Sequence, residues 1–160
     1  MGKYFLGLDC SSKAVHGVLI NDQAEYQEHF KWMSKLANFD ERFVEFLTNF
    51  FDDLGIIKER YPDLQVAIEA PIYIQNPKTT MQIAAVVYIA RFICSLHKLE
   101  CQAIQNKSWK KYVLERGNAS KQDIFKFANI LWKDKFKEQD HADAACIALW
   151  GRYNYLGEDI

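Results

Sequence analysis

The stretch KYFLGLDCSSKAVHGVLIN, residues 3 to 21, decides how the rest of the chain is arranged. It contains two short apolar runs, 3–10 and 14–21, separated by the turn-forming residues Ser11, Ser12 and Lys13. Apolar runs joined by a short polar turn predict a β-hairpin. Because Asp9 closes the first run, we expect a carboxylate at the end of the first strand.

The remainder of the chain continues with one strand and then alternates helices and strands. We expect a third strand around 25–32, a fourth at 64–70 and a fifth at 100–105. This order predicts an α/β fold with a five-stranded mixed sheet, in which strands 1 to 3 are antiparallel and strands 4 and 5 are parallel, with helices on both faces. The length of 160 residues, of which 49% are hydrophobic, predicts one domain over 1–160.

Four helices are expected. Helix 40–60 is amphipathic, with Asp40 as its cap. Helix 80–96 is apolar nearly all round, so we expect it to be buried on two sides, one of them against another subunit. A basic connection is expected at 107–120, and the last two helices at 121–132 and 140–156.

The cysteines and the apolar runs indicate a cytoplasmic protein with no membrane partner. The four cysteines lack C-x-x-C spacing and three of them lie in apolar stretches, which is typical of buried thiols in a reducing compartment. We expect neither a zinc site nor a disulfide. The first residues lack the apolar region of a signal peptide, and no apolar run approaches the ~20 residues that a membrane span needs.

The charge is unevenly distributed although the net charge is only −1. Residues 98–137 contain ten Lys and Arg against four Asp and Glu, whereas 21–69 contain five against eleven. Such segregation can produce a basic face that meets a phosphate backbone. The alternative is a chance imbalance on a solvated surface.

Four carboxylates are predicted to meet at one edge of the sheet. Asp9 ends the first strand and Glu69 the fourth, so they emerge at the same edge if these strands are parallel neighbours. Asp140 and Asp143 share one face at the start of the last helix, where like charges repel. As alternatives, Asp140 can cap the helix, Asp143 can interact with its dipole and Asp9 can open a turn. Glu69 is hardest to explain this way, since an unpaired charge in a strand built for burial costs several kcal/mol.

Taken together, these segments resemble the RuvC-type Holliday junction resolvases of the ribonuclease H-like superfamily. GLDCSSKAVHGVLI resembles the first hairpin of that family, AIEAPIY the strand with the catalytic glutamate, and DHADAACIAL the terminal helix with its two acids. SWKKYVLERGNASKQDIFKFANIL resembles the basic segment of the family. The likeness covers nearly the whole chain in the right order, although each motif alone is weakly specific. The compact chain is typical of a bacteriophage-type member.

The chain departs from the family pattern at two places. Cys10 and Ser11 stand where the family usually has Pro-Gly, so the hairpin turn must differ. Some relatives carry histidine in place of the first acid of the terminal helix, which leaves Asp140 and His141 as alternatives. We favour Asp140, because it shares a helix face with Asp143 whereas His141 points about 100° away. His141 is then expected to cap, pack or support the site from behind.

The resemblance implies that Asp9, Glu69, Asp140 and Asp143 are catalytic and bind metal. Clustered carboxylates repel one another unless divalent cations bind, and their hard oxygens select Mg²⁺, with Mn²⁺ as a substitute. Two ions about 4 Å apart would activate a water and stabilise the leaving 3′ oxygen of a phosphodiester. We expect Asp9 to bridge both ions, Glu69 and Asp143 to complete one shell each, and Asp140 to assist.

Five basic residues are expected to follow DNA phosphates with little base selectivity. They are Lys107, Lys110, Lys111, Arg116 and Lys121. Lys121 would also balance charge on the attacked phosphate, unless it is an ordinary solvated lysine. Tyr73 occupies the region where the family places an aromatic that stacks on an unpaired base; the alternative is a packed tyrosine, and Trp109 has the same ambiguity.

The predicted function is resolution of four-way DNA junctions in recombination and repair. A homodimer formed through helix 80–96 would bring two nuclease sites to the two strands of like polarity, which would be cut symmetrically. Ala84, Ala85 and Ala90 would permit close approach of the two helices at this interface. The alternative for this helix is burial within one subunit. The alternatives for the function are cleavage of another branched DNA or an RNA–DNA hybrid, or a non-catalytic nucleic-acid-binding role.

Overall fold

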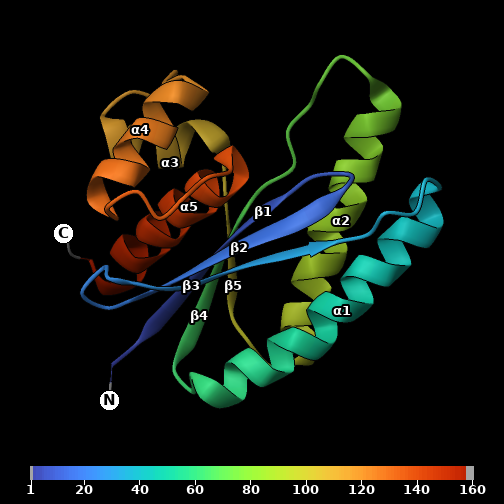
Figure 1. Cartoon of the computed structure of the whole chain (residues 1–160), viewed down its shortest axis with the longest axis horizontal. Helices are drawn as coiled ribbons and strands as arrows, with labels where there is room; N and C mark the ends of the chain where they lie inside the picture. The colour runs from blue at the N-terminus through green and yellow to red at the C-terminus, as the bar shows by residue number, and fades with distance from the viewer. Residues whose placement is uncertain (1, 158–160) are drawn as a thin grey trace.

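The predicted hairpin lies at the centre of the sheet (Figure 1). In the computed structural model, which describes residues 2–157, β1 (Tyr4–Cys10) pairs antiparallel with β2 (Ala14–Asn21). The Ser11 hydroxyl accepts hydrogen bonds from the backbone N–H groups of Lys13 and Ala14, each at 3.2 Å. A serine side chain therefore holds the turn at which the resembled family has Pro-Gly.

The sheet has the order β3-β2-β1-β4-β5, which confirms the predicted fold class. β3 (Tyr26–Met33) pairs antiparallel with β2, whereas β4 (Leu64–Glu69) lies parallel to both β1 and β5 (Cys101–Ile104). Because β1 and β4 are parallel neighbours, Asp9 and Glu69 reach the same edge of the sheet.

One face of the sheet is covered by α1 (Phe39–Arg60) and α2 (Pro77–Leu96) (Figure 1). The structure confirms that this helix is amphipathic, since Phe46 and Phe50 are fully buried in the core on this face. The expected cap was wrong: Asn38 caps α1, with its side-chain oxygen accepting from the Glu41 N–H, and Asp40 lies in the first turn. Asp40 is instead placed where the helix dipole favours an acid.

Contrary to the sequence prediction, α2 is long and apolar enough to cross a membrane by length and composition. Its mean hydropathy is 1.5, because its few polar residues do not offset its many aliphatic ones. One side of the helix packs into the domain through Val86, Val87, Ala90, Ile93 and Cys94. The core helix of a soluble domain passes the same test, so the match to a membrane span is weak evidence.

The other face carries α3 (Asn106–Leu114), α4 (Lys121–Leu131) and α5 (Gln139–Leu156) (Figure 1). The basic connection thus contains a helix, α3, which the charge-rich sequence did not reveal. α3 is anchored by Trp109, which is fully buried despite its polar neighbours in sequence. Helix α5 contacts β1, β2 and β4 and is buried along most of its length.

Helix α5 lies directly on the backbone of β1, because Gly7 has no side chain. A Cβ atom on Gly7 would lie 2.0 Å from the carbonyl oxygen of Ala144 and 2.4 Å from the backbone nitrogen of Ala148. Farther along α5, a Cβ on Gly151 would lie 2.8 Å from the Cβ of Ala67. Two glycines and the alanines opposite them therefore let helix and sheet approach more closely than larger residues would allow.

We predict that Gly7→Ala strongly destabilises the domain, because a methyl group there meets backbone atoms that cannot move aside. The expected loss is about 3 kcal/mol or more, which corresponds to a fall in Tm of roughly 6 to 12 °C. Thermal unfolding followed by circular dichroism measures it. Gly2→Ala is the matched control, since its Cβ would meet only the Asp22 side chain at 3.4 Å. An unchanged Tm for Gly7→Ala would contradict the close approach of α5.

Candidate active site

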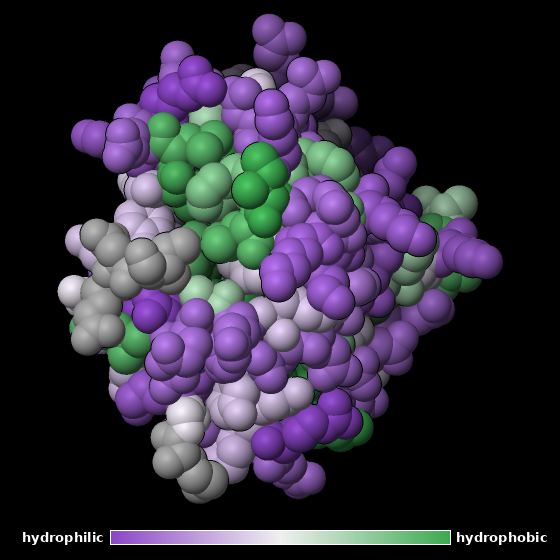
Figure 2. Space-filling view, turned by 60° about the vertical axis from the view of Figure 1, so that its left-hand side comes forward, coloured by the Kyte–Doolittle hydropathy of each residue, from purple (hydrophilic) through white to green (hydrophobic). Residues whose placement is uncertain are grey.

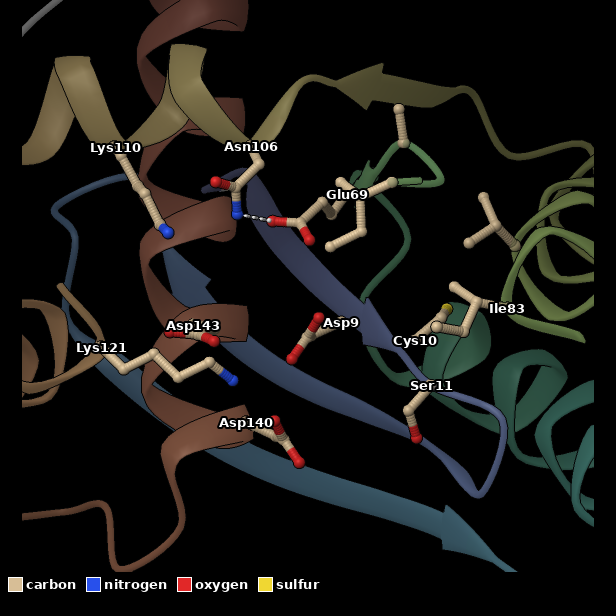
Figure 3. Close-up of a pocket in the computed structure, with 13 residues that line it drawn as sticks. Asp9, Cys10, Ser11, Glu69, Ile83, Asn106, Lys110, Lys121, Asp140 and Asp143 are labelled. Carbon is tan, nitrogen blue, oxygen red and sulfur yellow. Dashed lines mark hydrogen bonds between the residues drawn. The ribbon is translucent and has the colours of Figure 1, made fainter. Parts of the chain in front are cut away.

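A pocket of about 260 Å³ opens at the sheet edge where β1 and β4 end (Figure 3). All four predicted carboxylates line it: Asp9, Glu69, Asp140 and Asp143. They come from three elements, namely β1, β4 and the first turns of α5. Parallel pairing of β1 with β4 and docking of α5 thus bring together side chains that are far apart in the sequence.

Three of the acids form a compact group. Asp9, Asp140 and Asp143 each place a carboxylate oxygen within 4.8 Å of the other two. Asp140 is not the helix cap, because α5 is capped by Glu138, which makes no side-chain capping bond. Both α5 acids instead project from one side of the helix toward Asp9 (Figure 3).

Glu69 lines the pocket but is held apart from this group. A single carboxylate oxygen, Oε2, accepts two hydrogen bonds, one from Asn106 Nδ2 at 3.0 Å and one from Trp109 Nε1 at 2.5 Å. The buried Trp109 therefore orients Glu69 and is not available to stack on a base. Asn106 was not predicted from the sequence, because this residue is 37 positions away from Glu69 along the chain and only the fold brings the two together.

The pKa values of two of the acids, Asp9 and Asp143, are raised. Burial, followed by the charges of Glu69, Asp143 and Asp140, raises the pKa of Asp9 well above its ordinary value. Burial also raises the pKa of Asp143 to about 6, although Gln139 donates a hydrogen bond to its carboxylate at 2.9 Å. The group therefore pays an electrostatic cost that a nearby cation would relieve.

Two of the five predicted basic residues line the pocket, Lys110 on α3 and Lys121 at the start of α4 (Figure 3). The charge of Lys121 acts to lower the pKa of both Asp9 and Asp143, so it is more than a distant surface lysine. The other three lie on the surface outside the pocket. Lys107 and Lys111 are exposed on α3, and Arg116 forms an ion pair with Asp123 at 2.8 Å.

The structure places Asp140, and not His141, in the acidic pocket. His141, on α5, is buried against the sheet, where its Nε2 lies 2.8 Å from the carbonyl oxygen of Phe30. Its ring also lies against His16, with ring centroids 4.8 Å apart. This packed position agrees with the preference for Asp140 drawn from helix geometry.

Tyr73 lies in the segment between β4 and α2 and is 79% exposed, so it is not a packed tyrosine. Its neighbour Ile72 lines the pocket. Thr80 holds the segment, because its hydroxyl bonds to both the N–H and the carbonyl oxygen of Ile74. An exposed aromatic is thus presented beside the acidic pocket.

Figure 2 brings forward the side of the molecule that carries α3 and α4. Most of this face is hydrophilic, and one area of apolar side chains interrupts it. On these two helices Ile130 is exposed, while Val113, Leu114 and Phe127 are partly buried against the core. The basic segment therefore contributes a mixed surface and not a uniformly charged one.

The sequence is similar to those of two proteins that carry the same name. A crossover junction endodeoxyribonuclease RuvC from Salinibacter ruber is 31% identical over 149 residues, covering 90% of this chain and 82% of that protein. The protein of the same name from Brachyspira hyodysenteriae is 26% identical over 110 residues, 69% of each chain. No protein-family model matches the chain.

The fold is also that of solved relatives. The structure of Thermus thermophilus RuvC matches 96% of this chain with a TM-score of 0.76 and 13% identity. The same protein in complex with a Holliday junction substrate matches 97% with a TM-score of 0.78 and 12% identity. These matches confirm the predicted ribonuclease H-like fold. Because the likeness to the Salinibacter protein extends over most of both chains, this protein belongs to the RuvC family.

Proposed function

We propose that this protein is an endodeoxyribonuclease that resolves four-way DNA junctions. The observation that carries the proposal is the convergence of Asp9, Glu69, Asp140 and Asp143 on one pocket at the end of two parallel strands. Two relatives named crossover junction endodeoxyribonuclease, and a solved relative bound to a Holliday junction substrate, support the choice of substrate.

The donors in the pocket fit a hard divalent cation. Asp9, Asp140 and Asp143 offer only carboxylate oxygens, lie within 4.8 Å of one another and repel when ionised. Oxygen-only sites of this kind favour Mg²⁺, with Mn²⁺ as a substitute. When bound, a pair of such ions would activate a water and stabilise the leaving 3′ oxygen. The three aspartates would hold the ions together with Glu69.

The other pocket residues orient these acids and adjust their charge. Asn106 and Trp109 fix one oxygen of Glu69 and leave the other directed to the pocket (Figure 3). Lys121 supplies a positive charge near Asp9 and Asp143, where the attacked phosphate would lie. We assign Lys121 to binding this phosphate, because a flexible ammonium group suits a point contact with a phosphate oxygen.

Recognition of the DNA would rest on the phosphate backbone and on one aromatic. Lys107, Lys110, Lys111 and Arg116 lie along or just after α3, beside the pocket, and would contact phosphates. The exposed Tyr73, next to the pocket residue Ile72, would stack on an unpaired base at the branch point. Contacts of this type recognise shape more than sequence.

Two active sites would be supplied by a homodimer formed through α2. In the described part of the chain, the outer side of this helix exposes five apolar residues, Met81, Tyr88, Ile89, Phe92 and Leu96. An apolar stripe on a helix is the type of surface that a twofold interface buries. Ala90, which the sequence pattern placed at this interface, faces the subunit's own core instead.

We predict that Asp9→Asn abolishes cleavage and preserves binding, because it removes a central charge of the pocket with little change in shape. The rate of cutting a labelled four-way junction with Mg²⁺ should fall by at least about 100-fold, while binding measured in Ca²⁺ should stay within about twofold. Asp52→Asn, on the exposed surface of α1, is the control. Retained cleavage would refute the site. Parallel assays on fork, RNA–DNA hybrid and linear duplex distinguish the junction from other substrates.

We predict that Asp143→Asn stabilises the metal-free protein at neutral pH. In the folded state the pKa of Asp143 is about 6, above the ordinary value of 3.8, so the folded state holds its proton more tightly. Its contribution to stability is therefore present below pH ~4 and is lost as the pH rises to ~6. The gain in stability of Asp143→Asn over the parent protein should appear as the pH rises across this range and disappear in acid. A gain of about 1 kcal/mol would raise the Tm by about 2 to 4 °C.

The same comparison tests the proposed ion. Mg²⁺ should raise the Tm of the parent protein at pH 7 and raise that of Asp143→Asn less, because the variant has lost one ligand. Asp52→Asn again provides the control, since its side chain is exposed and does not line the pocket. Equal effects of Mg²⁺ on all three proteins would contradict binding at Asp143.

We predict that Phe92→Glu converts a dimer into a monomer. Phe92 is 57% exposed on the outer side of α2, so the change places a charge in the proposed interface without disturbing the core. Light scattering at micromolar concentration should give twice the chain mass for the parent and the chain mass for the variant. Val44→Glu, at a 61% exposed position on α1, is the matched control. A monomeric parent protein would refute symmetrical paired cutting by the free enzyme.

A further inference from the structure

A second group of metal-ligating side chains lies beside the acidic pocket. His16 on β2, Glu138 just before α5 and His141 on α5 each place one ligand atom within 4.8 Å of the other two. Nε2 of His16 is 3.0 Å from Oε2 of Glu138, and Nδ1 of His141 is 3.8 Å from the same oxygen. None of the three lines the acidic pocket. The group is therefore a separate site with different donor atoms.

His141 is oriented as a metal-ligating histidine usually is, and His16 directs one ring nitrogen to the group. A ligating histidine commonly directs its second ring nitrogen to a carbonyl or carboxylate group, which sets the tautomer of the ring. Nε2 of His141 donates to the Phe30 carbonyl oxygen at 2.8 Å, so the lone pair of Nδ1 faces the group. Nδ1 of His16 lies 3.8 Å from Asp140 Oδ2, and its Nε2 faces Glu138. Both rings are buried, with 4% and 6% exposure.

Glu138 has the same arrangement. Its Oε1 accepts a hydrogen bond from Lys31 Nζ at 2.9 Å, which leaves Oε2 for the histidines. Each of the three side chains thus directs one atom to the group and has a neighbour for its other polar atom. A hydrogen-bonded His16–Glu138–Lys31 chain is the metal-free alternative, and the two arrangements differ in whether an ion replaces the proton between His16 and Glu138.

We propose that His16, Glu138 and His141 bind one transition-metal ion of the Zn²⁺ class. Two imidazole nitrogens and one carboxylate oxygen form a donor set that Zn²⁺ takes in proteins, with water as the fourth ligand. Imidazole donors favour Zn²⁺ over Mg²⁺, whereas the neighbouring oxygen-only pocket has the opposite preference. The sequence-based expectation of no zinc site considered only cysteine spacing, and this group contains no cysteine.

The bound ion would tie the hairpin to the start of α5. In the β1–β2 register His16 pairs with Asp9, and His16 also lies beside Asp140, so the ion would sit behind the acidic pocket. It would stabilise the position of the first turn of α5 without contacting the acids that line the pocket. This inference does not depend on the proposed nuclease activity.

The test is a titration of the metal-free full-length chain with Zn²⁺ in excess Mg²⁺. Calorimetry should give one Zn²⁺ per chain, and Zn²⁺ should raise the Tm. His16→Gln and His141→Gln should each weaken Zn²⁺ binding by more than about 100-fold. This is more than the loss expected when a residue that only hydrogen-bonds to a metal ligand is removed. His97→Gln, remote on the α1–α2 side, is the matched control and should bind like the parent.

Further variants assign the ion to this group. Asp143→Asn should keep Zn²⁺ binding, and loss of binding in this variant would place the ion in the acidic pocket and overturn the proposal. Co²⁺ should give a tetrahedral visible spectrum without thiolate charge-transfer bands, and such bands would place it on cysteine. If His16→Gln fails to fold, Glu138→Gln at an exposed position serves instead. A folded parent that binds no Zn²⁺ would leave only the hydrogen-bonded chain and refute the inference.

Discussion

The close contact between α5 and β1 at Gly7 is the constraint on which the acidic pocket depends. Asp9 lies two residues beyond Gly7 along β1, and Asp140 lies one turn before Ala144 along α5. Helix and strand can bring these carboxylates together only if no side chain stands between the two backbones. The apolar packing of α5 against the sheet holds like charges in proximity, and the raised pKa values of Asp9 and Asp143 are the cost of that arrangement.

Much of the fold could be predicted from the sequence because it rests on local patterns. The two apolar runs and the serine turn predict the hairpin, and a crossover helix permits β1 and β4 to be the parallel neighbours that the structure shows. Parallel neighbours end at the same edge, which brings Asp9 and Glu69 together. The three-residue spacing of Asp140 and Asp143 places both on one helix face. These are inferences about periodicity and direction, and they need no knowledge of detailed packing.

The parts that could not be predicted depend on contacts between distant segments. Helix α3 was read as a basic connection because its lysines mask a single buried anchor, Trp109. That anchor becomes meaningful only when the fold brings its indole N–H to Glu69, with Asn106 beside it. The outer side of α2 is a similar case, since composition shows an apolar helix but cannot tell which residues face the core. For this reason the prediction that Ala90 lies at the interface is wrong.

Asp140 lies between two groups of donors with different chemistry. On one side are the oxygens of Asp9 and Asp143, and on the other is Nδ1 of His16 at 3.8 Å. The Asp140 carboxylate is therefore close enough to interact electrostatically with both groups, although its contact with His16 is too long for a hydrogen bond. A change of charge on either side therefore acts on the other through one side chain. Because α5 begins between the two groups, its N-terminal turn is the physical link between them.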